Sequence, residues 1–301
     1  MLRRARARGF REAFARRAAE LDAFSLARGS RLAAHRRAQA DRARLSREDV
    51  GRIACAAGVA QAEREKTQEK MSLHAKSPAR GGAEAATRVE AGEIAVRAIG
   101  RSDYETCWRA MRDFTDRRDA GTQDEIWLTE HAPIYTLGLA GRREHLKREN
   151  GIPVLRVDRG GQVTYHGPGQ LVAYTLIDLA RAGLSVRDMV RHLEIAVILW
   201  LESLGIAAYG KPCAPGVYTV VQDREAKIAA LGLRIRHGCS YHGLAVNIAM
   251  ELAPFDDIDP CGYPGLAVTQ LMDLDIARTV DEAGAELAPL LVRGLTAPRS
   301  I

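Results

Sequence analysis

The sequence predicts an α+β fold, an α/β two-layer arrangement in which a mixed, largely antiparallel sheet packs with helices. After residue 92, short apolar segments alternate like strands, and several of them are separated by polar turns, as in hairpins. Only two or three segments have the 3.6-residue period of an amphipathic helix. Because strands that pair as hairpins outnumber helices, an antiparallel sheet with a few packed helices is expected.

The elements follow in a regular order along the chain. Capping-box spacing at Ser102-x-x-Glu105 predicts a helix to about Arg118, and Ser185-x-x-Asp188 predicts a second helix. A polar turn at 222–226 predicts a hairpin, and 281–295 is expected to be the closing helix. Strands are expected at 94–99, 125–129, 134–137, 154–157, 171–177, 217–221, 228–235 and 241–249.

Composition narrows the class of protein. Hydrophobic residues at 47% and charged residues at 27% are ordinary for a soluble globular chain. The longest apolar run, 195–201, is far shorter than the roughly 20 residues of a membrane helix. The N-terminal region has no apolar signal-peptide segment. We therefore expect a cytoplasmic protein with no membrane partner.

The charge is divided unevenly along the chain. Residues 1–70 contain 18 Lys/Arg and 9 Asp/Glu of the chain's 44 and 38, which leaves 26 basic and 29 acidic residues for the remainder. The remainder therefore has no basic footprint for nucleic acid. We expect residues 1–91 to be a basic, disordered N-terminal extension, with the true start at Met71, and residues 92–301 to form a single catalytic domain.

The cysteines argue against a disulfide scaffold and a structural zinc site, because they are scattered and none forms a C-x-x-C pair. Cys261 lies in a segment bounded by two prolines and two glycines, Pro260–Gly265, where an exposed but rigid turn suits a nucleophile. The alternative for each cysteine is a small buried hydrophobe. Cys107 and Cys213 are interpreted in that structural way.

The segment Arg159–Gln170 contains four glycines, which let a backbone approach a ligand closely. It is not a phosphate loop, because no Gly-Lys-Ser/Thr follows. It is not a dinucleotide fingerprint either, because Val172 stands where the third glycine belongs. A tight connection between two strands and a substrate-lining loop both remain open.

Lys227 begins the apolar stretch of a predicted strand. A lysine there is usually a solvated end residue, but one that points inward can serve as a base. The small residues Ala229, Ala230 and Gly232 leave room for a slender apolar ligand.

The cluster from His237 to His242 suggests a metal site at first. On a strand, however, His237 and Cys239 face one way and His242 the other. No metal and no cofactor are therefore expected.

Taken in order, these segments resemble the lipoyl(octanoyl) transferase family. The resemblance covers roughly residues 92 to 265, and the N-terminal seventy residues have no counterpart in it. The motifs that carry it are Glu130-His-Ala-Pro133, Arg159–Gln170, Lys227–Arg234, Ser240-x-His-Gly-Leu-Ala-Val-Asn247 and Pro260-Cys-Gly262.

The resemblance implies a fold similar to the catalytic core of biotin and lipoate ligases. It implies octanoyl transfer from acyl carrier protein to a lysine of lipoyl domains, in 2-oxoacid dehydrogenases and the glycine cleavage H protein. Cys261 would carry the acyl thioester, and Lys227 would lower its pKa. The implied acyl pocket comprises Arg159, Gly160, Gly161, Gln162, Val163, Thr164, Tyr165, His166, Ala230, Leu231, Gly232, Gly243, Leu244 and Ala245.

Three other functions fit the sequence less well. An ATP-dependent lipoate or biotin ligase on the same core needs no cysteine, and typically has an acidic residue where Gly167 follows His166. A cysteine–histidine hydrolase would use His166 or His242 as its base. A basic nucleic-acid-binding protein is disfavoured by the charge distribution.

Overall fold

The structure is a computed structural model that describes Arg16 and residues 94–260 and 265–296. The expected N-terminal extension and Cys261 lie outside the described residues, so both expectations about them stay predictions.

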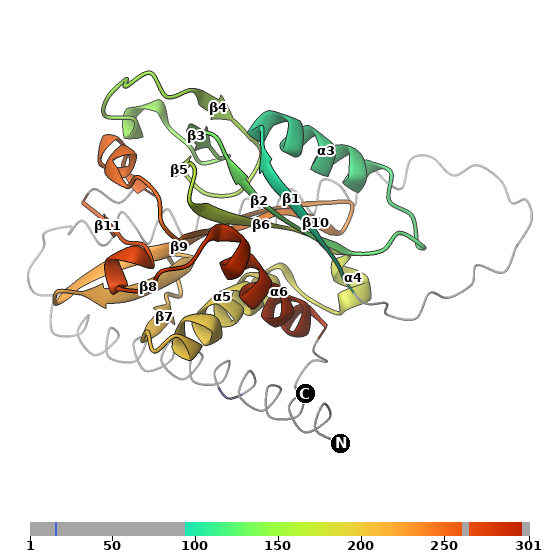
Figure 1. Ribbon diagram of the computed structural model, residues 1–301. Helices are drawn as coiled ribbons and strands as arrows, with labels where there is room; N and C mark the ends of the chain where they lie inside the picture. Colours follow the sequence, from blue (N-terminus) through green and yellow to red (C-terminus); the bar gives the residue numbers. More distant parts are fainter. Residues whose placement is uncertain (1–15, 17–93, 261–264, 297–301) are drawn as a thin grey trace, which may run out of the picture. The chain divides into compact units, whose positions relative to one another are not determined.

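The main sheet has eight strands within the described ranges, in the order β1-β2-β6-β10-β9-β8-β7, with β11 beside β9 (Figure 1). Strands β1 and β2 are parallel, as are β11 and β9, while the other pairs are antiparallel. The prediction of a mixed, largely antiparallel sheet is confirmed. The strands are β1 Ala95–Ser102, β2 Glu125–His131, β6 Gln170–Leu176, β7 Ala208–Gly210, β8 Gly216–Val221, β9 Arg224–Arg236, β10 Cys239–Asn247 and β11 Ala267–Val268.

A second, three-stranded sheet has the order β4-β3-β5. Its strands are β3 Ile134–Leu137, β4 Val154–Arg156 and β5 Val163–His166. Its own side chains, such as Tyr135, form a separate apolar cluster with Phe255. The chain therefore leaves the main sheet after β2 and enters the second sheet with β3. The hairpin-like sequence pattern did not indicate this change of sheet.

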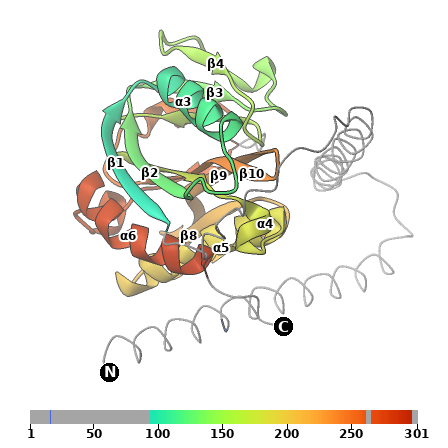
Figure 2. The same cartoon turned by 90° about the vertical axis from the view of Figure 1, so that its right-hand side faces the viewer.

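Helices cover both faces of the main sheet (Figure 2). On β6, Leu171 and Ala173 pack in the cluster with α5 and α6, whereas Val172 and Tyr174 pack in the cluster with α3. None of the described helices is long and apolar enough to cross a membrane. The helices are α3 Tyr104–Asp116, α4 Leu179–Ala182, α5 Val186–Ser203 and α6 Val280–Leu295, with short 3-10 turns at Arg143–His145, Ala253–Asp257 and Met272–Leu274.

Capping explains where two helices begin. Ser185 and Asp188 form the expected capping box of α5. The expected box at Ser102 is wrong: Asp103 caps α3 instead and accepts a hydrogen bond from the Thr106 backbone N–H. Ser102 is the last residue of β1, so its backbone belongs to the sheet.

Two hairpin turns correct the expected boundaries. The turn between β8 and β9 is only Gln222–Asp223, both with positive φ, as a two-residue hairpin turn requires. His237 also has positive φ and lies with Gly238 between β9 and β10. It therefore does not lie on a strand with His242, as the sequence interpretation assumed.

Strand β9 contains an irregularity beside β8. Val217 pairs with Ala229, and Tyr218 pairs with Lys227, so the pairing skips Ile228. An extra residue of this kind is a β-bulge, which changes the alternation of side chains along the strand.

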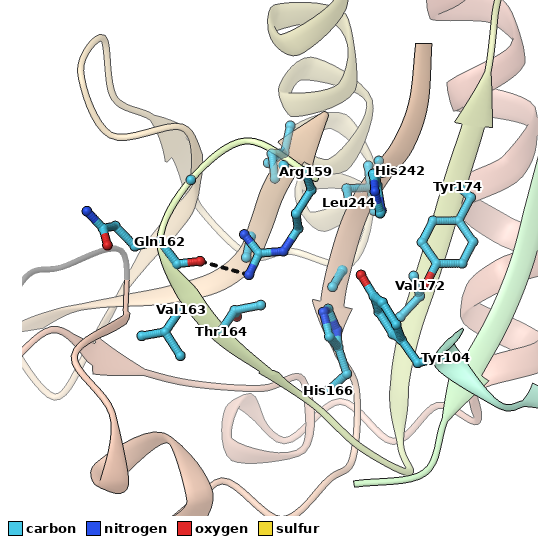
Figure 3. Close-up of a pocket in the computed structure, with 16 residues that line it drawn as sticks. Tyr104, Arg159, Gln162, Val163, Thr164, His166, Val172, Tyr174, His242 and Leu244 are labelled. Atoms are coloured by element: carbon cyan, nitrogen blue, oxygen red, sulfur yellow. Dashed lines mark hydrogen bonds between the residues drawn. The ribbon is translucent and has the colours of Figure 1, made fainter. Parts of the chain in front are cut away.

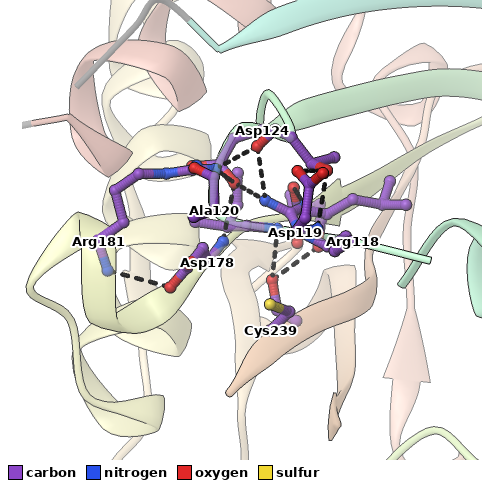
Figure 4. A network of polar contacts seen from close by, with 12 residues as sticks. Arg118, Asp119, Ala120, Asp124, Asp178, Arg181 and Cys239 are labelled. Atoms are coloured by element: carbon purple, nitrogen blue, oxygen red, sulfur yellow. Dashed lines mark hydrogen bonds and ion pairs between the residues drawn. The ribbon is translucent and has the colours of Figure 1, made fainter. Parts of the chain in front are cut away.

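An ion-pair cluster, which we call the Asp124 cluster, ties α3, β2 and α4 together (Figure 4). The Asp124 carboxylate pairs with the Arg118 and Arg181 guanidinium groups and accepts from the Asp178 backbone N–H at 2.8 Å. Arg118 also donates to the Leu176 carbonyl oxygen at 2.9 Å. The cluster therefore fixes the C-terminal end of β6 to the segment that follows α3.

Candidate functional site

A narrow cavity of about 50 Å³ opens between the glycine segment and strands β6, β9 and β10 (Figure 3). Twelve of the fourteen residues implied as an acyl pocket line it. The two exceptions are Gly160, whose N–H donates to the Leu233 carbonyl oxygen at 2.8 Å, and Tyr165, which packs beside Tyr135. Four further lining residues were not expected: Tyr104, Val172, Tyr174 and His242.

Arg159 holds the glycine segment in shape rather than projecting a free charge. Its guanidinium donates to the Thr136 carbonyl oxygen at 2.7 Å and to the Gln162 carbonyl oxygen at 2.8 Å. A Cβ added at Gly232 would lie 3.0 Å from the Gly160 carbonyl oxygen and 3.2 Å from Arg159 Cδ. The glycine segment therefore packs directly onto β9, and position 232 leaves little room for a side chain.

The tautomer of His166 is fixed by a chain of buried amides. Asn247 Nδ2 donates to the Thr269 carbonyl oxygen, so Asn247 Oδ1 faces Gln170 and accepts from its Nε2. Gln170 Oε1 then faces His166 Nδ1 at 2.7 Å, which must carry the proton. His166 Nε2 is left as an acceptor that has no partner among the described residues. Burial lowers the pKa of His166 to about 3, so the ring is neutral at pH 7.

His242 has φ of 59°, an uncommon conformation for a residue with a side chain within a strand. Its Nε2 donates to Asp158 Oδ1 at 3.0 Å, and its buried Nδ1 has no partner within the described ranges. Burial opposes ionisation of Asp158, but hydrogen bonds from His242 and Tyr241 hold its pKa well below the usual range. His242 is therefore oriented by a carboxylate, with one nitrogen left open.

Aromatic and imidazole rings form the wall beside α3. Tyr104 stacks on His166 at 5.3 Å between centroids, and the Tyr174 hydroxyl lies 2.6 Å from His131 Nε2. Burial raises the pKa of Tyr104 to about 12, so its hydroxyl stays protonated. Sequence reasoning missed Tyr104 and Tyr174: α3 lies far from the glycine segment in the sequence, and the all-apolar pattern of β6 does not show which of its side chains face the cavity.

Lys227 is the fourth residue of β9 and is buried, not a solvated strand end. Its Nζ donates to the Pro215 carbonyl oxygen at 3.1 Å and lies 5.2 Å from the centre of the Tyr218 ring. Its own carbonyl oxygen accepts from the Thr269 N–H at 3.0 Å, beside β11. The segment that follows residues 261–264 is therefore hydrogen-bonded to the backbone at Lys227.

The three cysteines within the described residues divide by exposure. Cys107 and Cys239 are buried, and burial raises the pKa of both thiols. Cys213 is exposed, so its interpretation as a packing residue is wrong.

The Lipoyl protein ligase A/B catalytic domain family matches residues 103–288 of this chain. An octanoyltransferase of Thiobacillus denitrificans is 54% identical over 202 residues, which cover 67% of this chain and 91% of the relative. An octanoyltransferase of Aromatoleum aromaticum is 56% identical over 200 residues, covering 66% of this chain and 85% of the relative.

Solved structures share the fold at low identity. A bi-partite lipoate protein ligase of Thermoplasma acidophilum aligns with a TM-score of 0.52 and 19% identity, covering 68% of this chain and 82% of that one. A lipoate-protein ligase A solved with ATP gives the same TM-score at 17% identity, covering 68% of this chain and 85% of that one. The expected resemblance to the lipoate ligase core is confirmed.

Fold and sequence together define a protein of the lipoyl protein ligase A/B catalytic class. Within that class the chain belongs to the lipoyl(octanoyl) transferase family, whose members are acyltransferases.

Proposed function

We propose that this protein transfers an octanoyl group from acyl carrier protein to a lysine of lipoyl domains, through a thioester on Cys261. The observation that carries the proposal is a cavity with an apolar wall on the same strand as a buried lysine. Ala230, Leu231 and Gly232 of β9 line the cavity, and Lys227 precedes them on that strand. Each methylene of an acyl chain that is buried against this wall contributes about 0.8 kcal/mol.

The proposed chemistry needs one nucleophile and one proton carrier. The Cys261 thiolate, stabilised by the Lys227 ammonium, attacks the carbonyl carbon of the donor thioester, and the carrier thiolate leaves with the lysine's proton. Neutral Lys227 then takes a proton from the acceptor amine as that amine attacks acyl-Cys261. The C–S bond breaks and the thiolate and ammonium are restored, so protons balance over the cycle.

The ligase alternative shares this fold but draws its support from the fold alone. The relatives at 54% and 56% identity are octanoyltransferases, whereas the lipoate ligases are below 20% identical. A transfer assay without ATP separates the two functions, since a ligase must first form an adenylate.

Intact-mass analysis after incubation with octanoyl-carrier protein tests the proposal. We expect one octanoyl adduct that is cleaved by hydroxylamine and absent in Cys261→Ser. Cys213→Ser is the matched control, because Cys213 is an exposed cysteine outside the motif. An adduct that persists in Cys261→Ser, or one carried by Cys213 or Cys239, contradicts the assignment.

Lys227 substitutions separate its two proposed roles. Lys227→Ala should raise the apparent pKa of Cys261 towards about 8.5, the free-cysteine value, in an iodoacetamide alkylation profile. Lys227→Arg should fail to restore transfer, since a guanidinium cannot accept the amine's proton. Unchanged alkylation with abolished transfer would assign Lys227 to the second step alone.

A further inference from the structure

Glu194 is a buried carboxylate on the apolar side of α5. It is 8% exposed and lies next to Leu193 and Ile195, both fully buried in the core. Its Oε1 accepts from the Gly216 backbone N–H at 2.8 Å. A Cβ added at Gly210 would lie 3.2 Å from its Oε2. The glycine on β7 thus leaves room for this carboxylate, and the first residue of β8 supplies its hydrogen-bond donor.

Lys227 reaches the start of β8, at Pro215 and Gly216, from β9. Its Nζ donates to the Pro215 carbonyl oxygen, and a Cβ added at Gly216 would lie 2.5 Å from its Cε and 2.9 Å from its Nζ. The Gly216 N–H therefore donates to the carboxylate, and the end of the lysine side chain occupies the space where a Cβ of residue 216 would lie. A side chain at Gly216 would displace the lysine.

A buried ammonium needs an opposite charge, because carbonyl oxygens and ring faces replace only part of its hydration. The charged groups that act on Glu194 are Lys227 and Arg191, the latter one turn earlier on α5. Burial raises the pKa of Glu194 to about 7, although the Gly216 N–H and these two cations act in the opposite direction. The carboxylate is therefore mostly ionised at pH 8.

We propose that Glu194 is a positioning residue that holds the Lys227 ammonium at the Pro215–Gly216 backbone and balances its charge. The inference rests on the proposed role of Lys227 in octanoyl transfer. Glu194 touches neither the acyl group nor the acceptor amine in this scheme and acts only through the lysine.

A purely structural role, capping the Gly216 N–H, is separable from charge. Glu194→Gln keeps a carbonyl oxygen for the Gly216 N–H and removes only the negative charge. Glu194→Asp keeps the charge on a shorter side chain. Glu225→Gln is the control, because Glu225 lies two residues before Lys227 but bonds to the Tyr209 hydroxyl at 2.6 Å and pairs with Lys211.

The experiment is a double-mutant cycle on the full chain with Lys227→Ala, measured as octanoyl transfer against pH. Glu194→Gln should lower kcat/KM at pH 8 at least tenfold and move the alkaline limb of the profile to lower pH. The shift is expected because no carboxylate then favours the ammonium form. Glu194→Asp should recover part of the loss, and Glu225→Gln should lose less than twofold. In the Lys227→Ala background, Glu194→Gln should change residual transfer less than twofold.

An equal loss in both backgrounds, or an unshifted alkaline limb, overturns the pairing and leaves Glu194 structural. The same double-mutant cycle, measured as urea unfolding midpoints, tests the pairing independently of the transfer assay. Glu194→Gln should lower the midpoint while Lys227 is present, and it should not lower it in the Lys227→Ala background. If the unsubstituted chain transfers no octanoyl group, the proposed function fails, while coupled midpoints still support the ion pair.

Discussion

The Asp124 cluster and the wall of the cavity are both polar and buried, yet they differ in how their atoms are paired. In the Asp124 cluster, Arg118 is 5% exposed and Asp124 is 11% exposed at the side chain, and opposite charges meet directly. In the cavity wall, His166 and His242 are held through one ring nitrogen and leave the other without a partner among the described residues. The first arrangement fixes the fold, while the second leaves unpartnered acceptors on residues that line the cavity.

This difference teaches which buried polar groups to interpret as structural. A satisfied network loses stability when it is broken, because its remaining charges stay buried. An unsatisfied acceptor already costs stability, so natural proteins rarely keep one without a functional reason. Substitutions in the two regions should therefore separate stability from activity.

Breaking the Asp124 cluster should have the largest effect. Asp124→Ala leaves two guanidinium groups without their carboxylate, and we expect a loss of about 3–5 kcal/mol in the free energy of unfolding. Urea unfolding measures it. Glu105→Ala, which breaks an exposed ion pair with Arg109 on α3, is the control and should change the midpoint little. If both substitutions lowered the free energy of unfolding by a similar amount, the buried cluster would contribute no more to stability than a surface group.

His166 should make the fold sensitive to acid. The folded-state pKa of about 3 lies below the unfolded value of 6.5, so only the unfolded chain takes up the proton between them. Stability from this group is complete above pH 6.5 and falls as the pH drops towards 3, by about 3 kcal/mol at pH 4.5. His166→Gln should flatten the dependence in urea midpoints measured from pH 7 to 4.5. An unchanged slope would mean that the imidazole is already solvated.

His242→Asn should affect activity more than stability. Asparagine tolerates positive φ, and Asp158 keeps its bonds to Tyr241 and Trp108, so a loss of about 1–2 kcal/mol is expected. Octanoyl transfer should fall more than tenfold, since the ring lines the cavity. A stability loss as large as that of Asp124→Ala, with transfer retained, would place His242 among the structural groups.

A chain starting at Met71 should show the smallest effect. The contacts described above for both regions lie within residues 94–296, and residues 1–70 carry a charge balance opposite to the remainder. Full transfer activity and an unchanged melting temperature are expected. A decrease of several degrees, or loss of most turnover, would show that the segment packs on the domain.

Local pattern predicted most of the fold, because strands and amphipathic helices depend on neighbours in the chain. The Ser185 cap and the β8–β9 hairpin follow from spacing alone. The three-stranded sheet was not predictable, because β3 pairs with β5 across the whole of residues 138–162 and the pattern of each strand does not state a partner.

The cavity shows the same limit. Twelve lining residues belong to contiguous motifs, which is why the family resemblance could name them as candidates. Tyr104 reaches it because α3 packs over β6, and Tyr174 because β6 pairs with β10 at Gly243; neither tertiary contact has a local signature. Asp158 was adjacent to the glycine segment, but its partner His242 lies on β10, 84 residues later.

The skipped residue Ile228 has a consequence for how β9 presents its lysine. Because Tyr218 faces Lys227 while Val217 faces Ala229, Lys227 shares a face with Ala230 and Gly232 rather than with Ala229. Straightening the strand with all its residues kept would restore strict alternation and turn the ammonium to the opposite side of the sheet. Deleting Ile228 would instead leave the lysine on its present side, one residue nearer the cavity. The single extra residue in β9 therefore decides whether the Lys227 side chain lies on the same side of the sheet as the cavity.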